Sequence, residues 1–284
     1  MHDSASASVL IWTISLASIL CTLLRPRGIG EAYWACGGGI LLILFRLTRL
    51  PQAAHAVREG WDVYLFLTGM MILAELAREE GVFDWVADVA ARQAKNSKAR
   101  LFVLVYLVGT VVTALLSNDA TAVVLTPAVL AVVRRVKVDP KPYLFACAFI
   151  ANAASFVFPI SNPANLVIFG EHMPPLWAWL HIFLLPSLAS ILATFLCLRW
   201  VLRKELGGDM RSDARQALLS REGRLALGGL IAATAALVAS SALGLSLGAP
   251  TCCAAICAMA VVAWRDRNIA AKVVPSCRWW LDSS

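Results

Sequence analysis

Leu115–Pro127 reads LLSNDATAVVLTP, and this stretch interrupts an apolar run that extends from residue 101 to residue 133. Its polar centre consists of Ser117, Asn118, Asp119 and Thr121. A charged Asp at the centre of a bilayer costs about 2.5–3.5 kcal/mol on insertion scales, so it is expected to face a protein interior or a wet cavity. The run is also too long for one simple span of about 20 residues. We therefore predict a re-entrant hairpin over 101–134, with Asp119 turned inward.

A second apolar run, Phe149–Gly170, reads FIANAASFVFPISNPANLVIFG. Pro159 and Pro163 each remove a backbone donor and disrupt a helix. Freed backbone groups at membrane depth survive only when they are buried in protein or line a wet cavity. The run therefore predicts a broken helix over 143–170. Broken helices of this kind form binding sites in many transporters, and the polar side chains expected here are Asn152, Ser161, Asn162 and Asn165.

Composition places the chain in a membrane. Of its 284 residues 60% are hydrophobic and 15% are charged, with a mean hydropathy of +0.72, whereas soluble domains are about 45–50% apolar and about 25% charged. The net charge of +7 comes from Lys and Arg in short clusters between apolar runs, as in membrane loops rather than in a nucleic-acid surface. No metal-ligand spacing, nucleophile elbow or phosphate loop occurs, so neither a metal site, a cofactor nor an enzyme is indicated.

The positions of Lys and Arg predict the topology. The apolar runs fall at 9–24, 32–47, 61–77, 101–133, 143–170, 176–198, 225–243 and 250–264. Basic and neutral loops alternate only if the hairpin does not cross, which places the basic loops 78–100, 134–142 and 199–224 in the cytoplasm and the N-terminus outside. We read the first run as a retained helix rather than a cleaved signal peptide. The predicted fold is all-α and polytopic, with about seven crossings, one re-entrant hairpin and one broken helix.

The two polar stretches resemble a known family. LLSNDATAVVLTPAVLAV (115–132) and FACAFIANAASFVFPISNPANLVIF (145–169) are similar to the arsenite/antimonite efflux permeases of bacteria, within the larger ion-transporter superfamily. The resemblance implies an elevator-type carrier of the inner membrane with an inverted repeat, exporting arsenite or antimonite with protons or the membrane potential. It also implies an ATPase subunit in some members. The residues that the resemblance places at the substrate site are Ser117, Asn118, Asp119, Thr121, Asn162 and Asn165.

The chain departs from the family in length, because members are about half as long again and hold a second hairpin and broken helix. The expected parts are scaffold helices over 1–100, a transport element over 101–170, connecting helices over 171–264 and a divergent tail over 265–284. Within the first part, residues 82–93 carry valines on one helix face, and Asp84, Asp88 and Arg92 lie elsewhere. This pattern predicts an interfacial helix. The tail suggests truncation near residue 270, and half a site would need a second copy or a separate chain to complete it.

Arsenite near neutral pH is a small neutral triol, for which hydroxyl and amide groups suit better than cations. We therefore expect Ser117, Asn118, Thr121, Asn152, Ser161, Asn162 and Asn165 to bind it, with Asp119 as a proton relay. One alternative site is a thiol pair, Cys253 and Cys257, four residues apart on one helix face. Alternative functions are a sodium/proton antiporter or sodium-coupled anion carrier, because Ser-Asn motifs at helix ends also suit Na⁺, and a non-transporting membrane fragment or partner subunit.

Overall fold

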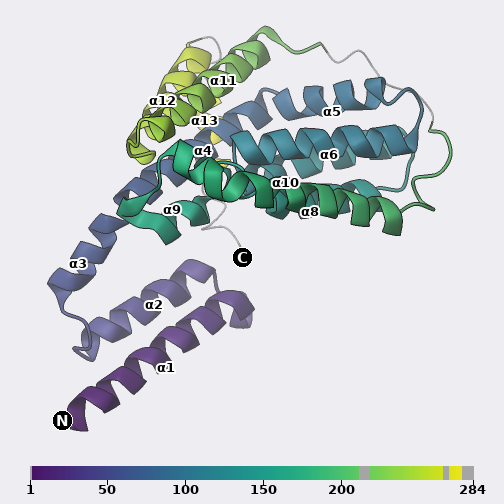
Figure 1. Cartoon of the computed structure of the whole chain (residues 1–284). Helices are drawn as coiled ribbons and strands as arrows, with labels where there is room; N and C mark the ends of the chain where they lie inside the picture. The colour runs from purple at the N-terminus through teal and green to yellow at the C-terminus, as the bar shows by residue number, and fades with distance from the viewer. Residues whose placement is uncertain (1, 211–217, 265–268, 277–284) are drawn as a thin grey trace. The chain divides into compact units, whose positions relative to one another are not determined.

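The computed structural model describes residues 2–210, 218–264 and 269–276, and the regular elements in these residues are all helices (Figure 1). The prediction of an all-α membrane protein is therefore confirmed. The chain divides into two compact units, one built chiefly from the residues before Asp62 and the other from Asp62–Val273. The principal helices are α1 (His2–Leu24), α2 (Glu31–Leu44), α3 (Leu50–Glu59), α4 (Trp61–Glu79), α5 (Val82–Gln93), α6 (Lys98–Leu115), α7 (Thr126–Arg135), α8 (Lys141–Ala153), α9 (Pro163–Phe169), α10 (Leu176–Val201), α11 (Arg221–Ala242), α12 (Gly248–Ala263) and α13 (Ile269–Ser276).

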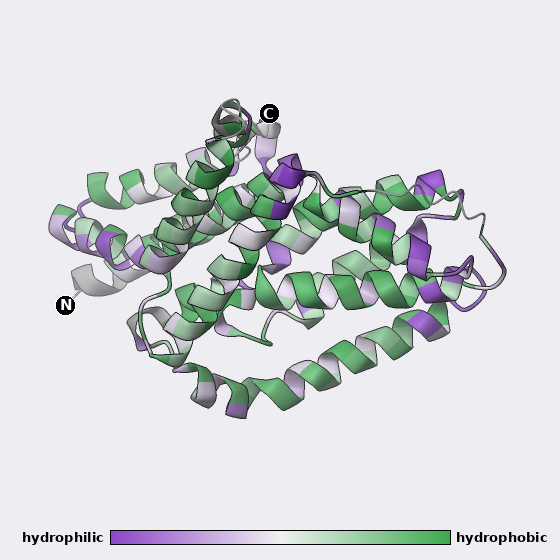
Figure 2. Ribbon diagram, turned by 90° about the horizontal axis from the view of Figure 1, so that it is seen from above, coloured by the Kyte–Doolittle hydropathy of each residue, from purple (hydrophilic) through white to green (hydrophobic). Residues whose placement is uncertain are grey.

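Several helices are long and apolar enough to cross a bilayer. Among the described residues, four qualify by themselves: Ser6–Leu24, Lys98–Leu115, Leu176–Val201 and Arg221–Ala242. The pair α3 and α4 makes a fifth if it counts as one bent span, and α2 and α12 are shorter apolar helices. In Figure 2 the hydrophobic colour runs along the helices, while hydrophilic residues gather at helix ends and in loops. The expected number of about seven crossings stays a prediction.

In the first unit, α1 and α2 pack as a helical hairpin. Ser18 of α1 donates its hydroxyl hydrogen to the carbonyl oxygen of Trp34 at 2.8 Å. A Cβ atom on Gly38 of α2 would lie 2.5 Å from the Ser18 Oγ, so the two helices approach closely because position 38 has no side chain.

In the second unit, α6 lies against both α5 and α8, and α8 in turn lies against α10 (Figure 1). A Cβ atom on Gly109 of α6 would lie 2.7 Å from the Ile150 side chain of α8, which again makes a glycine the point of close approach. Tyr106 of α6 donates its hydroxyl hydrogen to the carbonyl oxygen of Ile191 in α10 at 2.7 Å. These contacts hold α6 in the middle of the unit.

Both long apolar runs are interrupted, as the polar residues predict. The run 101–133 forms α6, a break at Leu116 (φ −106°, ψ −81°), a π-helix at Ala120–Leu125 and then α7. The run 143–170 forms α8, a turn with a short 3-10 helix at Pro159–Ser161, and α9. Proline stands in the first turn of α9, where the missing backbone donor has no helical partner to lose. Pro127 stands at the junction of the π-helix and α7, where it removes a backbone donor from a helical arm that continues.

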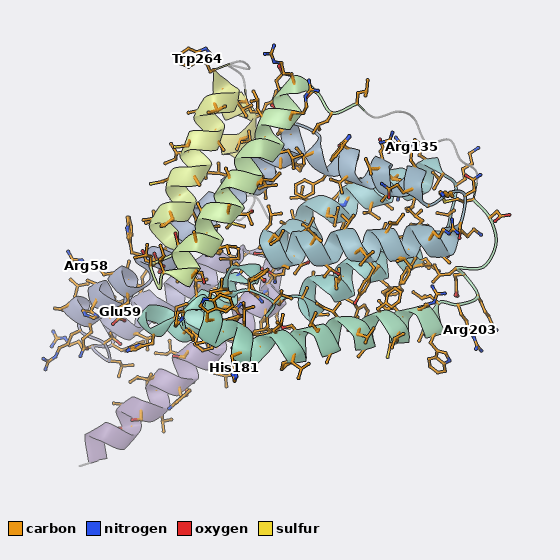
Figure 3. All side chains as sticks on the ribbon, turned by 45° about the horizontal axis from the view of Figure 1, so that its top comes forward. Arg58, Glu59, Arg135, His181, Arg203 and Trp264 are labelled. Carbon is orange, nitrogen blue, oxygen red and sulfur yellow. The ribbon has the colours of Figure 1, made fainter. Side chains whose placement is uncertain are left out.

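The chain enters and leaves the hairpin at the same end of the second unit. Tyr143, at the start of α8, donates to the carbonyl oxygen of Lys98 at the start of α6, with the two oxygen atoms 3.2 Å apart. The segment after α10 joins the same end, because the amide of Met210 donates to the carbonyl oxygen of Asn96 at 2.7 Å. Figure 3 labels Arg135 and Arg203 at this end. The described residues around Asn96, Tyr143 and Met210 therefore lie at one end of the second unit. That the three basic loops share the cytoplasmic side stays a prediction, because residues 211–217 of the third loop lie outside the described residues.

A carboxylate near the start of α4 caps α12. Asp62 accepts hydrogen bonds from the backbone amides of Gly248 at 2.8 Å and Leu247 at 3.3 Å. These two amides lie at the N-terminus of α12, where backbone N–H groups have no partner within the helix. An acidic side chain stabilises a helix N-terminus both by hydrogen bonding and through the helix dipole. A Cβ atom on Gly248 would lie 2.2 Å from the carbonyl oxygen of Asp62. The sequence gives no sign of this contact, because the two residues are far apart in the chain.

Replacing Asp62 by alanine should destabilise the protein by about 1 kcal/mol, the usual effect of losing a helix cap. Unfolding of the purified protein in detergent, followed by circular dichroism, measures the change. Asp84→Ala is the control, since Asp84 is an exposed carboxylate in the first turn of α5. Equal stability of the two variants would show that the cap contributes nothing.

Candidate functional site

The hairpin tip is stabilised by its own hydroxyl groups. Ser117 Oγ accepts a hydrogen bond from the backbone amide of Ala120 at 3.1 Å and so supplies a partner at the start of the return arm. The hydroxyl oxygens of Thr113 and Thr121 lie 2.8 Å apart and join the two arms, and both residues are fully buried. Thr126 donates to the carbonyl oxygen of Thr121 at 2.8 Å. Ser117 and Thr121, both expected at the substrate site, therefore have structural partners here.

A π-helix at Ala120–Leu125 begins directly after Asp119 at the hairpin tip. Its wider hydrogen-bond register is rare and occurs often at functional sites.

The broken helix is held in the same way. Asn162 caps α9, because its Oδ1 accepts from the amide of Ala164 at 2.9 Å. Asn165 is fully buried, and its amide nitrogen donates to the carbonyl oxygens of Ser155 at 3.1 Å and Pro159 at 3.3 Å. Carbonyl groups left without helical partners by the break are thus satisfied within the protein, as membrane depth requires.

One side chain joins the two interrupted segments. Ser161 Oγ accepts from the amide of Phe158 at 2.9 Å and donates to the carbonyl oxygen of Ala114 at 2.8 Å, and Ser161 is fully buried. Ala114 lies in the last turn of α6, three residues before Ser117. Trp179 of α10 supports the break from the other side, since its indole nitrogen donates to the carbonyl oxygen of Phe156 at 3.0 Å. The hairpin tip and the helix break therefore meet.

Two buried amide oxygens in these segments have no hydrogen-bond partner among the described residues: Asn118 Oδ1 and Asn165 Oδ1. The orientation of the Asn165 amide is fixed, because its nitrogen already donates to two carbonyl groups. An unsatisfied buried acceptor costs about 1–3 kcal/mol, so each oxygen favours the arrival of a hydroxyl donor, a water molecule or a cation. One such acceptor comes from each interrupted segment.

The expected inward orientation of Asp119 is wrong for this chain. Ser117, Ala120, Thr121 and Val124 are buried, and their helical spacing defines the face turned towards the protein. Asp119 falls on the opposite face, with Ala122 and Val123, and is exposed. Among the described residues no hydrogen bond or ion pair involves its carboxylate.

Cationic residues are missing from both interrupted runs. No Lys or Arg occurs from residue 101 to residue 133 or from residue 142 to residue 198. A cavity of about 540 Å³ lies beside the tip, between α5, α6 and α11, but its lining is apolar apart from Thr234 and includes Leu115, Leu116 and Leu230. That cavity does not suit a polar solute.

Two expected features lie apart from the meeting point. Asn152 is exposed, and its amide nitrogen donates to the carbonyl oxygen of Ala148 one turn earlier in α8, at 3.1 Å. Cys253 and Cys257 are exposed free thiols on α12, and no described contact joins them to the interrupted segments. The tail expected over 265–284 lies mostly outside the described residues, apart from α13.

Removing one threonine hydroxyl at the tip should cost more than removing both. Thr113→Val leaves the Thr121 hydroxyl buried without its partner, and Thr121→Val does the reverse, each at about 1–3 kcal/mol. The double variant should regain part of this loss, because it leaves neither hydroxyl unsatisfied. Unfolding of all three variants in detergent measures the coupling. Strictly additive losses would contradict a direct Thr113–Thr121 contact.

Comparison with known proteins agrees with this architecture. An arsenical pump membrane protein of Escherichia coli is 25% identical over 201 residues, which cover 70% of this chain and 47% of that protein. A 46 kDa membrane protein of Mycobacterium leprae is 31% identical over 157 residues, or 55% of this chain and 37% of that protein. An uncharacterised transporter of Mycobacterium tuberculosis is 32% identical over 115 residues, or 40% of this chain and 27% of that protein. The chain thus spans less than half the length of these relatives.

The family model described as citrate transporter (CitMHS) matches residues 9–274. This match takes in α2–α12 and both interrupted segments. Because it covers most of the sequence, the chain belongs to the citrate transporter family of membrane transport proteins.

Proposed function

We propose that this chain is a secondary transporter that exports arsenite or antimonite. The observation that carries the proposal is the pair of unpartnered amide oxygens, Asn118 Oδ1 and Asn165 Oδ1, in two segments that contact each other. A neutral triol carries hydroxyl donors that both oxygens can accept. The similarity to the arsenical pump membrane protein over 70% of the chain supports the same substrate.

The same acceptors disfavour a free carboxylate as substrate. A carboxylate needs donors or cations, yet the interrupted runs hold no Lys or Arg and two acceptors without donors. The family description names citrate, but these residues offer a tricarboxylate little to bind. Arsenite fits them better because it is uncharged and donates hydrogen bonds.

Proton exchange completes the proposal. Asp119 is the single carboxylate between residues 101 and 133, and its exposed side chain lies two residues after Ser117 at the tip. We assign it the proton-relay role, with export coupled to protons or to the membrane potential in the bacterial inner membrane. An ATPase subunit and a second copy of the chain are further proposed partners.

A sodium-coupled carrier is the second candidate, and it rests on the same oxygens. Amide and carbonyl oxygens beside helix breaks also coordinate Na⁺ in transporters, and Asn165 brings its oxygen beside the freed carbonyl groups of Ser155 and Pro159. Replacing sodium by choline in vesicle assays separates the candidates: a proton-coupled arsenite exporter keeps its rate, whereas a sodium-coupled carrier loses it.

Asn118→Ala should raise the KM for arsenite by roughly two- to tenfold, the effect of one lost hydrogen bond. Asn152→Ala is the matched control, because Asn152 is an exposed asparagine bonded within its own helix. Uptake of arsenite into inverted membrane vesicles carrying this chain measures both. Equal KM values for the two variants would remove Asn118 from the site. Absence of uptake by the unmodified chain would favour a fragment or partner subunit that does not transport alone.

Asp119→Asn should abolish the dependence of arsenite export on the pH gradient, because an amide cannot exchange a proton. Initial rates with and without a protonophore measure the dependence, and Asp84→Asn serves as the exposed-carboxylate control. Export by Asp119→Asn that slows as strongly with protonophore as the unmodified protein would exclude the relay role.

A further inference from the structure

Asp88 of α5 is buried. Its side chain is 9% exposed, and its carboxylate forms an ion pair with the guanidinium group of Arg135, which is 36% exposed. Arg135 is the last residue of α7, so the pair joins α5 to the base of the hairpin's return arm (Figure 3). The sequence pattern set Asp88 apart from the valine face of an interfacial helix and did not indicate this ion pair.

Asp88 does not pair with the arginine nearest to it on its own helix. Arg92 stands four residues after Asp88 on the same helix, which is the usual spacing for a helical ion pair, but Arg92 is exposed and Asp88 pairs across to α7 instead. The reason is packing. Around Asp88 the buried face of α5 carries the small residues Ala87, Ala90 and Ala91, which let α7 approach closely enough for its terminal arginine to reach the carboxylate.

The rest of this interface is apolar. The buried residues of α7 are Ala128, Val129, Val132 and Val133. These side chains hold the helices together by shape and burial alone. The charge pair adds a stronger constraint, because a buried carboxylate separated from its partner is strongly unfavourable. The position of Arg135 also suits its charge, since a cation at a helix C-terminus interacts favourably with the helix dipole.

We propose that Asp88 and Arg135 form a clamp that sets the position of the hairpin tip. The π-helix and α7 form a continuous arm from residue 120 to residue 135, so fixing its base restrains the far end that carries Thr121. Asp88 and Arg135 are positioning residues, distant from the proposed substrate. With α6 also packed against α5, the clamp makes α5 and the hairpin one rigid body. This inference does not depend on which solute is carried.

Hydrogen–deuterium exchange of the full chain in detergent tests the clamp without any transport assay. Asp88→Asn should speed exchange of amides in the hairpin, residues 117–135, by about tenfold or more, because the arm opens locally once its charge pair is lost. Arg135→Gln should have the same effect. Asp88→Glu, which keeps the charge, should restore slow exchange, and the swapped variant Asp88→Arg with Arg135→Asp should restore part of it.

The controls use neighbours of the pair. Asp84→Asn and Arg134→Gln each remove an exposed charge from the same two helices and should leave hairpin exchange unchanged. Unchanged exchange in Asp88→Asn would overturn the clamp. Faster exchange spread equally over α1 and α11 would also overturn it, because that result describes a general loss of stability rather than positioning.

A transport measurement adds a second readout. If the unmodified chain carries arsenite, Asp88→Asn should raise the KM more than it lowers the maximal rate, and Asp88→Glu should recover the KM. A fall in maximal rate alone, proportional to the amount of folded protein, would contradict a positioning role. If the unmodified chain carries no arsenite, the proposed function fails while the exchange experiment still decides the clamp.

Discussion

Backbone groups freed by a helix break at membrane depth must find partners inside the protein, because lipid offers none. This requirement organises the centre of the molecule. Ser161 satisfies one carbonyl group at the end of α6, and Asn165 satisfies two in the broken segment. The Asn165 bonds lie within the broken segment, whereas the Ser161 bond to Ala114 forms only when the hairpin and the broken helix are in contact.

Because most polar groups in these segments bond to the protein itself, few polar atoms remain that could bind a ligand. Ser117, Thr121, Ser161 and Asn162 each have a partner in the protein. Polar character at membrane depth is therefore only partly a sign of ligand binding, and most of it here is structural. The polar atoms without a hydrogen-bond partner say more about a ligand site than the residue types do. Among the described residues of the two segments they are two amide oxygens, one from each segment, and both are acceptors. The proposed arsenite site rests on these two acceptors.

The sequence predicted the interruptions because proline and polar residues at membrane depth act through local rules. Pro127, Pro159 and Pro163 mark where regular hydrogen bonding stops, and the positions of Lys and Arg indicate which loops share a side. It could not predict which face of the tip turns inward, since one residue of rotation exchanges Asp119 for Ala120. It also missed the pairing of Asp88 with Arg135, because the two residues are 47 positions apart and lie on different helices. Long-range pairs leave no periodic signal.

The cap that Asp62 provides for α12 has a consequence for biosynthesis. The carboxylate and the amide of Gly248 are separated by 186 positions, and ribosomes add about 5–20 residues per second. Roughly 10–40 s therefore pass, at that rate, between the emergence of the acid and that of the helix start it will hold. Asp62 is therefore synthesised well before the helix start that it caps, and this contact forms only after α12 has been made.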